Sequence, residues 1–229
     1  MGRATIIIGL LYAMAGLAFL TMALAYKGYF LLLLWPAAGF LILSAGYLYF
    51  GPVVYFKAPD GQQKLWARII HFPGFLFNRI TWKIGRLTKP DDLWNEIVPD
   101  VFLGRKLTGK SQLPDNIALV IDLTAEYLEP EDIKTSVDYK CVPTLDGTAM
   151  ISDNFAEVLD YAANKQAVTY IHCAVGHGRA AMFVACLLIR SGICSDAEEA
   201  ERLIKTKRPR VHLRPAHKKV IDFHGSSQG

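Results

Sequence analysis

An eight-residue stretch decides the fold of this sequence, and it reads His172-Cys173-Ala174-Val175-Gly176-His177-Gly178-Arg179. Residues 167–172 form a mostly apolar run of strand length, and residues 180–191 are apolar with helical spacing. A strand, a glycine-containing loop and a helix in this order point successive backbone N–H groups at one spot, where the helix dipole also favours negative charge. The stretch therefore predicts an α/β domain with an anion-binding loop.

The residue types inside this loop suit a phosphate group. Gly176 and Gly178 permit the positive φ angles that such a nest of N–H groups needs. The same N–H groups and the cation of Arg179 would stabilise a thiolate at Cys173 and make it a nucleophile. Arg179 has a planar fork suited to two phosphate oxygens. His177 either contacts a second anionic group or points to solvent, and both alternatives stay open.

The segments before and after the loop complete an α/β pattern. Strand-like runs alternate with helical spacing, which argues for a mostly parallel sheet covered by helices on both faces. The expected strands are 101–104, 117–123 and 137–142, a helix is expected at 155–165, and a capping box at Ser195–Glu198 opens another helix.

The motif His-Cys-x5-Arg resembles the dual-specificity branch of the protein tyrosine phosphatase superfamily, over roughly residues 95–224. Residues 97–104 look like the first hairpin of that branch. Residues 142–146 and 213–215 look most like the mitochondrial subfamily that dephosphorylates phosphatidylglycerophosphate. The resemblance implies a protein-tyrosine-phosphatase-like fold and a cysteinyl-phosphate intermediate, with no metal and no cofactor.

The resemblance also implies roles for individual residues. Cys173 would attack phosphorus, while Arg179 and the loop 174–179 hold the phosphate. His172 would order the loop through a hydrogen bond. The general acid of the family is an Asp in the loop after the strand that precedes the nucleophile, and Asp146 fits this place.

Two positions leave alternatives open. Asp153 competes with Asp146 as the acid, although Asp153 or Ser152 is better placed to cap the following helix. Ala180 stands where the family usually has Ser or Thr, whose hydroxyl eases departure of the thiolate. Breakdown of the phosphoenzyme is therefore expected to be slow, and a weakly active, phosphate-binding pseudophosphatase remains an alternative.

The N-terminal residues have the composition of a membrane hairpin. Residues 1–54 contain only two charged side chains, Arg3 and Lys27. The apolar stretches 4–26 and 28–54 each exceed the ~20 residues that a transmembrane helix needs. A second span directly after the first argues against a signal peptide, whereas Pro36 leaves a re-entrant hairpin open. We assign residues 1–56 to this hairpin.

Residues 57–90 are basic and aromatic, and we expect them to form an amphipathic collar on anionic lipid. Pro73-Gly74 is expected to divide the collar into two short pieces, and packing on the soluble domain is the alternative. By the positive-inside rule, the domain 91–229 lies on the cytoplasmic side of a multi-pass protein. The cations of the collar are Lys57, Lys64, Arg68, Arg79, Lys83, Arg86 and Lys89.

The remaining charged residues and cysteines indicate no other class of protein. Residues 205–219 carry seven cations, which form either a solvated face or a rim that steers phosphorylated substrate. The domain is net acidic and lacks nucleic-acid-binding motifs, so no nucleic-acid partner is expected. Cys141, Cys186 and Cys194 lack metal-ligand spacing. Reduced thiols are expected, with a Cys141–Cys173 pair on oxidation as the alternative.

These observations predict a membrane-anchored phosphomonoester hydrolase whose domain follows two transmembrane helices. A phosphotyrosine or phosphoserine/threonine protein is the substrate expected first. A phospholipid such as phosphatidylglycerophosphate or a phosphoinositide is the alternative.

Overall fold

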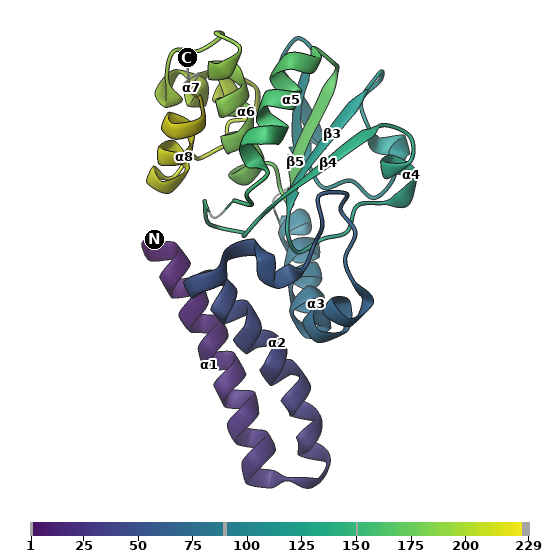
Figure 1. Ribbon diagram of the computed structural model, residues 1–229, viewed down its shortest axis with the longest axis vertical. Helices are drawn as coiled ribbons and strands as arrows, with labels where there is room; N and C mark the ends of the chain where they lie inside the picture. The colour runs from purple at the N-terminus through teal and green to yellow at the C-terminus, as the bar shows by residue number, and fades with distance from the viewer. Residues whose placement is uncertain (1, 89–90, 150, 226–229) are drawn as a thin grey trace. The chain divides into compact units, whose positions relative to one another are not determined.

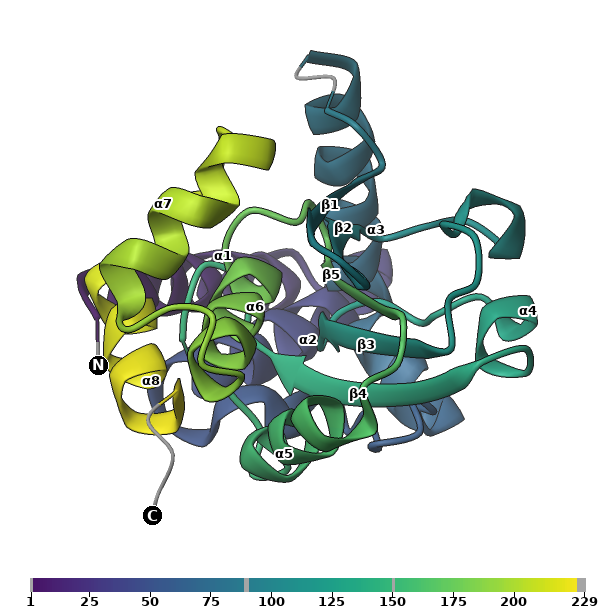
Figure 2. The same cartoon turned by 90° about the horizontal axis from the view of Figure 1, so that it is seen from above.

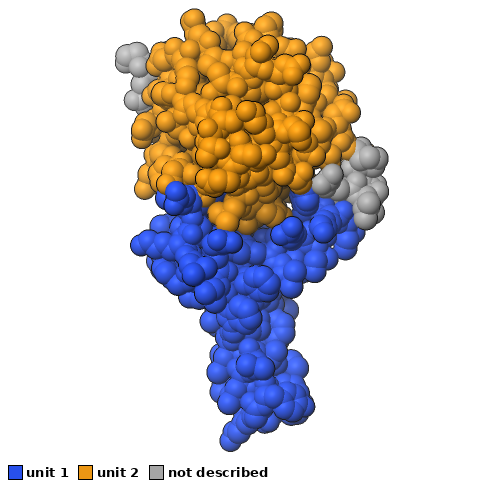
Figure 3. Space-filling model, turned by 90° about the vertical axis from the view of Figure 1, so that its right-hand side faces the viewer, with its two compact units in different colours: residues 1–58, 62–90 blue, residues 59–61, 91–229 orange. Residues whose placement is uncertain are grey.

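The computed structural model describes residues 2–88, 91–149 and 151–225. The chain divides into two compact units, which are coloured separately in Figure 3. The first contains residues 1–58 and 62–90, and the second contains residues 59–61 and 91–229. We describe each unit by itself.

The first unit begins with a helical hairpin (Figure 1). Helix α1 (Arg3–Tyr26) is followed by a 3-10 segment (Gly28–Leu33) and by α2 (Leu34–Ala45). A π segment (Gly46–Phe50) and a second 3-10 segment (Gly51–Tyr55) complete the second arm. Residues 3–26 and 28–55 are each long and apolar enough to cross a membrane.

Small residues bring the arms of the hairpin together. A Cβ atom at Gly16 would lie 2.8 Å from Leu41 Cγ, and one at Gly9 would lie 2.7 Å from Leu48 Cδ2. Glycine at these positions lets the helices approach closely, as in membrane helix pairs. Pro36 lies in the first turn of α2, where its missing N–H would have no partner within the helix, so it does not break α2.

Helix α3 (Leu65–Thr88) follows, and it runs without interruption through Pro73. The predicted division into two short pieces is therefore wrong. Pro73 cannot donate to the carbonyl of Ile69, but the indole N–H of Trp35 donates to that oxygen instead, at 2.8 Å. Lys89, which the sequence places in the basic collar, lies outside the described residues.

One side of α3 carries large apolar side chains that are exposed in the structure. Their helical spacing places them on a single stripe, and exposed cations accompany them. The apolar residues are Leu65, Trp66, Ile69, Phe72, Leu76, Phe77, Ile80 and Ile84, and the cations are Lys64, Arg68, Arg79 and Lys83.

The second unit is built on a five-stranded sheet with the order β1-β2-β5-β3-β4. Only β1 is antiparallel to its neighbour, which confirms the predicted mostly parallel sheet. The strands are β1 (Trp94–Val98), β2 (Val101–Arg105), β3 (Leu119–Thr124), β4 (Asp138–Thr144) and β5 (Thr169–Cys173).

Different helices cover the two faces of the sheet, over cores of different size. Figure 2 shows α6 beside β3 and α5 beside β4. Alternate residues of β3 point to opposite faces, so Leu119 and Ile121 join the large core with these helices, whereas Val120 joins a smaller core with Ile133 of α4. The helices of this unit are α4 (Glu131–Lys134), α5 (Phe155–Lys165), α6 (Arg179–Arg190), α7 (Ala197–Lys207) and α8 (Pro215–Gly225).

The cap of α7 lies one residue later than predicted. Asp196, not Ser195, is the N-cap residue, and its carboxylate accepts a hydrogen bond from the N–H of Glu199 at 2.8 Å. The Glu199 carboxylate accepts from both the N–H and the hydroxyl of Ser195. In the motif Asp196-x-x-Glu199, the Asp196 carboxylate thus satisfies the N–H of Glu199, and the Glu199 carboxylate holds Ser195, the residue before the cap.

Candidate active site

The carboxyl end of β5 places Cys173 at the start of the predicted loop, and α6 begins at Arg179. Cys173 is buried, and its Sγ accepts a hydrogen bond from the N–H of Gly176 at 3.2 Å. Gly176 has φ +74°, and a Cβ atom there would lie 2.4 Å from the carbonyl oxygen of Gly104. Glycine is therefore required at 176 both by its backbone conformation and by the approach of β2.

Gly178 does not have the conformation that the sequence predicts. Its φ is −123°, so it needs no left-handed backbone. A Cβ atom at Gly178 would instead lie 3.3 Å from Cε1 of His217. The loop thus has one obligatory positive φ, at Gly176, and one close side-chain neighbour, at Gly178.

Arg179 points its guanidinium into a buried site and is held there by oxygen atoms. Nη1 and Nη2 donate to the two carboxylate oxygens of Glu126 at 2.8 and 2.7 Å, a bidentate pair. Nη1 also donates to the carbonyl of Thr144 at 2.9 Å. Burial lowers the pKa of Arg179, but the carboxylates of Glu126 and Asp146 more than offset this effect and hold that pKa well above its usual value.

The other edge of this guanidinium faces a different partner. Nη2 lies 3.0 Å from Oδ1 of Asp146, and the buried Nε has no hydrogen-bond partner among the described residues. An Arg edge made of Nε and Nη2 is the shape that binds two oxygens of a phosphate. Because Glu126 occupies the neighbouring Nη1–Nη2 edge, the Nε–Nη2 edge is the one suited to an anion.

Sequence reasoning missed Glu126. It lies two residues after the carboxyl end of β3, and its side chain is buried. The carboxyl ends of parallel strands meet at one edge of a sheet, so an acidic residue directly after β3 was the available signal. The sequence alone gives no measure of its distance from Arg179.

Asp146 belongs to the turn Leu145–Thr148, where Gly147 adopts φ +69°. Its side chain is 67% exposed, although its carboxylate contacts Arg179. Asp153 is exposed and precedes α5, whose N-cap residue is Asn154 without a side-chain capping bond. The predicted capping by Asp153 or Ser152 is therefore wrong, since Ser152 Oγ donates to Asn154 Oδ1.

Comparison with known proteins agrees with this geometry. Residues 101–224 match the family model described as "Dual specificity phosphatase, catalytic domain". This chain belongs to the dual-specificity phosphatase family. The predicted family and fold, and the prediction of a phosphatase, are thereby confirmed.

Individual relatives indicate which members of the family this chain resembles. Human "Phosphatidylglycerophosphatase and protein-tyrosine phosphatase 1" is 32% identical over 179 residues, which cover 69% of this chain and 86% of the relative. The Arabidopsis thaliana "Phosphatidylglycerophosphate phosphatase PTPMT2" is 25% identical over 168 residues, 68% of this chain and 72% of the relative. The crystal structure of PTPMT1 in complex with PI(5)P superposes with a TM-score of 0.52 at 25% identity, covering 58% of this chain and 95% of that one.

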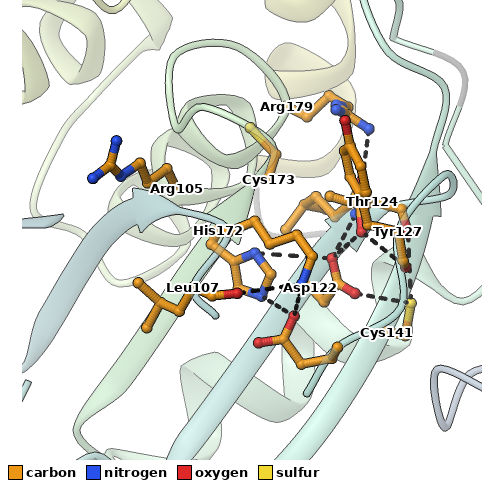
Figure 4. Close-up of polar contacts among 12 residues, drawn as sticks. Arg105, Leu107, Asp122, Thr124, Tyr127, Cys141, His172, Cys173 and Arg179 are labelled. Carbon is orange, nitrogen blue, oxygen red and sulfur yellow. Dashed lines mark hydrogen bonds and ion pairs between the residues drawn. The ribbon is translucent and has the colours of Figure 1, made fainter. Parts of the chain in front are cut away.

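His172 lies directly before Cys173 in the phosphatase loop, between two buried carboxylates (Figure 4). Its Nδ1 is 3.9 Å from Asp122 Oδ1, and its Nε2 is 3.5 Å from Glu129 Oε2. Neither ring nitrogen makes a hydrogen bond among the described residues, so the predicted bond to the loop is not observed there. His172 instead lies beside the carboxylates of Asp122 and Glu129.

The same three residues have the chemistry of metal ligands. One ligand atom from each of Asp122, Glu129 and His172 lies within 4.8 Å of the others. The Lys106 ammonium is already 3.7 Å from Glu129, and Asp122 Oδ1 accepts from the N–H and hydroxyl of Thr124. A cation at this position would have to compete with both sets of contacts.

His177 has a defined partner at the edge of the loop. Its Nε2 lies 3.2 Å from Oδ2 of Asp91, whose other oxygen pairs with Arg210 at 2.9 Å. Burial and the charge of Arg208 lower the pKa of His177, against the opposing effect of Asp91. The sequence left open whether His177 contacts a second anionic group or points to solvent. In the structure, its partner is the carboxylate of Asp91.

Arg208, one of the seven cations in residues 205–219, is buried rather than part of a solvated face. Its Nε donates to the carbonyl of Gly176 and its Nη2 to that of Val175, both at 3.0 Å. In a trans peptide the C=O and the next N–H point in opposite directions. Arg208 therefore turns the N–H groups of Gly176 and His177 toward the inside of the loop.

We expect Glu126→Gln to damage the site by leaving Arg179 without its bidentate partner. Breaking a buried ion pair costs about 3–5 kcal/mol of stability. We expect kcat/KM for an aryl phosphate to fall by at least about tenfold, since a charge-assisted bond to the phosphate clamp is lost. Steady-state kinetics and thermal unfolding measure the two effects.

Asp153→Asn is the matched control, because Asp153 is an exposed carboxylate. We expect wild-type kinetics from it. Wild-type kcat/KM in Glu126→Gln would contradict the role of Glu126, and a large loss in Asp153→Asn would contradict the assignment of Asp146.

Proposed function

We propose that this protein is a membrane-anchored lipid phosphatase that hydrolyses the phosphomonoester of phosphatidylglycerophosphate or a related phospholipid. The similarity to the human and Arabidopsis relatives carries this proposal, because both are named for phosphatidylglycerophosphate and the matches cover more than two thirds of this chain. The phosphoprotein substrate expected first from the sequence has less support than the lipid alternative.

In the proposed first step, Cys173 Sγ attacks phosphorus and the lipid alkoxide leaves. The Nε–Nη2 edge of Arg179 and the inward N–H groups of the loop hold the phosphate oxygens. Asp146 gives its proton to the leaving oxygen, since its carboxyl lies beside the same edge of Arg179.

In the second step, water attacks the phosphocysteine and the Cys173 thiolate leaves. Asp146, now a carboxylate, takes the proton of the attacking water. Ala180 is buried at the start of α6 and offers no hydroxyl to the departing sulfur. The second step is therefore the slower one in this proposal.

We assign membrane attachment to the first unit. The segments 3–26 and 28–55 would span the bilayer as a hairpin, and the cations that follow them would keep the catalytic domain on the cytoplasmic side. The exposed apolar stripe of α3, with its neighbouring cations, supports the collar at residues 57–90 as an interfacial element on anionic lipid. This attachment would present lipid headgroups to the enzyme without release from the membrane.

A phosphotyrosine substrate is the second candidate, because the name of the human relative also includes a protein-tyrosine phosphatase. Phosphate release by the full-length protein in vesicles compares phosphatidylglycerophosphate, PI(5)P and a phosphotyrosine peptide. We expect kcat/KM for phosphatidylglycerophosphate to exceed that for the peptide by at least about tenfold, or 1.4 kcal/mol. Cys173→Ser is the control without a thiolate and should release no phosphate. A preference for the peptide would reject the lipid proposal, and no turnover of any substrate would favour a pseudophosphatase.

We expect the missing hydroxyl at Ala180 to make phosphoenzyme hydrolysis rate-limiting. Rapid-quench kinetics with an aryl phosphate should show a burst near one equivalent of phenol, followed by slow turnover. Ala180→Ser should speed the slow phase about tenfold, the worth of one well-placed hydrogen bond, and leave the burst rate unchanged. Ala181→Ser, also buried in α6, is the control and should not speed it. A wild-type enzyme without a burst would show that another group serves the leaving thiolate.

We expect a peptide spanning residues 64–88 to bind vesicles that contain anionic lipid and to release them as salt is raised. Replacing Arg68, Arg79 and Lys83 by Gln removes about 1 kcal/mol of attraction for each cation, so affinity should fall at least about 100-fold. Vesicle co-sedimentation measures the change, and uncharged vesicles provide the comparison. Equal binding to charged and uncharged vesicles would contradict the collar.

A further inference from the structure

His217, in the first turn of α8, is a buried imidazole for which the proposed mechanism has no role. Its Nδ1 accepts a hydrogen bond from the N–H of Arg214 at 3.3 Å, so this nitrogen carries no proton. Its Nε2 lies 3.0 Å from the carbonyl oxygen of Thr148, and a carbonyl only accepts. His217 is therefore the neutral tautomer protonated on Nε2, with both nitrogens engaged.

One partner of this ring, Thr148, belongs to the turn that carries Asp146. Thr148 closes the turn through its N–H and its hydroxyl, which both donate to the carbonyl of Leu145. In the same turn, the Arg214 guanidinium donates to the carbonyl of Gly147, the residue before Thr148, at 2.7 Å. Two consecutive carbonyls after Asp146 are thus held by the segment that begins α8.

The other side of the ring reaches the phosphate loop. A Cβ atom on Gly178 would lie 3.3 Å from His217 Cε1, so the imidazole packs against the backbone just before Arg179. His217 therefore lies between the loop that holds phosphate and the turn that supplies the proton.

We propose that Arg214 and His217 form a latch that positions the general acid: they fix the backbone of the Asp146 turn against the phosphate loop, so that the carboxyl meets the leaving oxygen. The latch rests on the proposed role of Asp146 as the acid. Both residues act through the turn and are positioning residues, since neither contacts the reacting atoms in this mechanism.

The surroundings of His217 favour the neutral form that the latch needs. Burial lowers the pKa of His217, and the positive charges of Arg214, His212 and Arg179 add to this, against the stabilising bond to Thr148. A proton added to Nδ1 would face the N–H of Arg214 and break that hydrogen bond. Acidification should therefore open the latch once the pH falls below the lowered pKa of His217.

Substrates that differ in their leaving group provide the test. A poor leaving group needs the proton from Asp146, whereas 4-nitrophenolate leaves without it. The readout is kcat/KM, which reports the first step, because kcat is limited by breakdown of the phosphocysteine that all substrates share. In the full-length protein, we expect His217→Leu to lower kcat/KM for phenyl phosphate at least about tenfold more than kcat/KM for 4-nitrophenyl phosphate. In the Asp146→Asn background, the same substitution should cause no further leaving-group-dependent loss.

A conservative variant separates the effect of the hydrogen bonds of His217 from the effect of its size. The side chain of Gln accepts through its oxygen and donates through its nitrogen, and it does not titrate. We expect His217→Gln to restore kcat/KM for phenyl phosphate to within about threefold of wild type and to reduce the loss of activity in acid. His212→Leu, at an exposed histidine of the same segment, is the control and should keep the wild-type dependence on the leaving group at neutral pH.

The outcomes separate failure of the latch from failure of the acid assignment. If Asp146→Asn shows no leaving-group-dependent loss, Asp146 is not the acid and the proposed mechanism fails. If Asp146→Asn shows that loss but His217→Leu slows both substrates equally, or acts equally in the Asp146→Asn background, the latch is wrong. If His217→Leu does not fold, Arg214→Gln decides by the same substrate series, because Arg214 is exposed and its loss removes the bond to Gly147.

Discussion

A guanidinium taken out of water must recover its lost hydrogen bonds from the protein, and Arg179 does so through Glu126 and the carbonyl of Thr144. Removing either member of such a pair would leave an uncompensated buried charge, at a cost of about 3–5 kcal/mol. The pairing also sets direction, since it occupies one edge of the guanidinium and leaves the Nε–Nη2 edge for an anion. The proposed phosphate clamp is therefore oriented by the protein's own carboxylate.

The loop around Cys173 is ordered by a second arginine of a different kind. Arg208 contacts carbonyl oxygens of Val175 and Gly176 rather than an acid of the site, and so fixes the direction of two peptide planes. Gly176 packs against the backbone of Gly104, which leaves no room for a side chain. N–H groups preorganised in this way stabilise negative charge without reorganising during the reaction.

Local patterns predicted the fold well. The apolar runs at 117–123 and 167–172 correspond to β3 and β5, because a buried parallel strand is recognisable from its own composition. Predictions failed where a residue distant in the sequence determined the local structure. Pro73 does not end α3, because Trp35 supplies the missing donor. Glu126 was missed for the same reason, since its partner Arg179 is 53 positions away in the chain.

Asp146 has two requirements that oppose each other, and the turn satisfies both. The proposed general acid must reach the leaving oxygen accurately, yet Asp146 pairs with Arg179 and would have to yield that position to substrate phosphate. The backbone of the turn is held at Gly147 and Thr148, while the Asp146 side chain is 67% exposed. In the proposed mechanism, substrate phosphate, which carries more negative charge than one carboxylate, would displace Asp146 from Arg179. The displaced carboxyl would stay near the reacting centre, because the carbonyls of Gly147 and Thr148 are held by hydrogen bonds. In the proposed mechanism, a turn whose peptide is held and whose Asp146 side chain is exposed would therefore allow one residue both to pair with Arg179 and to donate the proton.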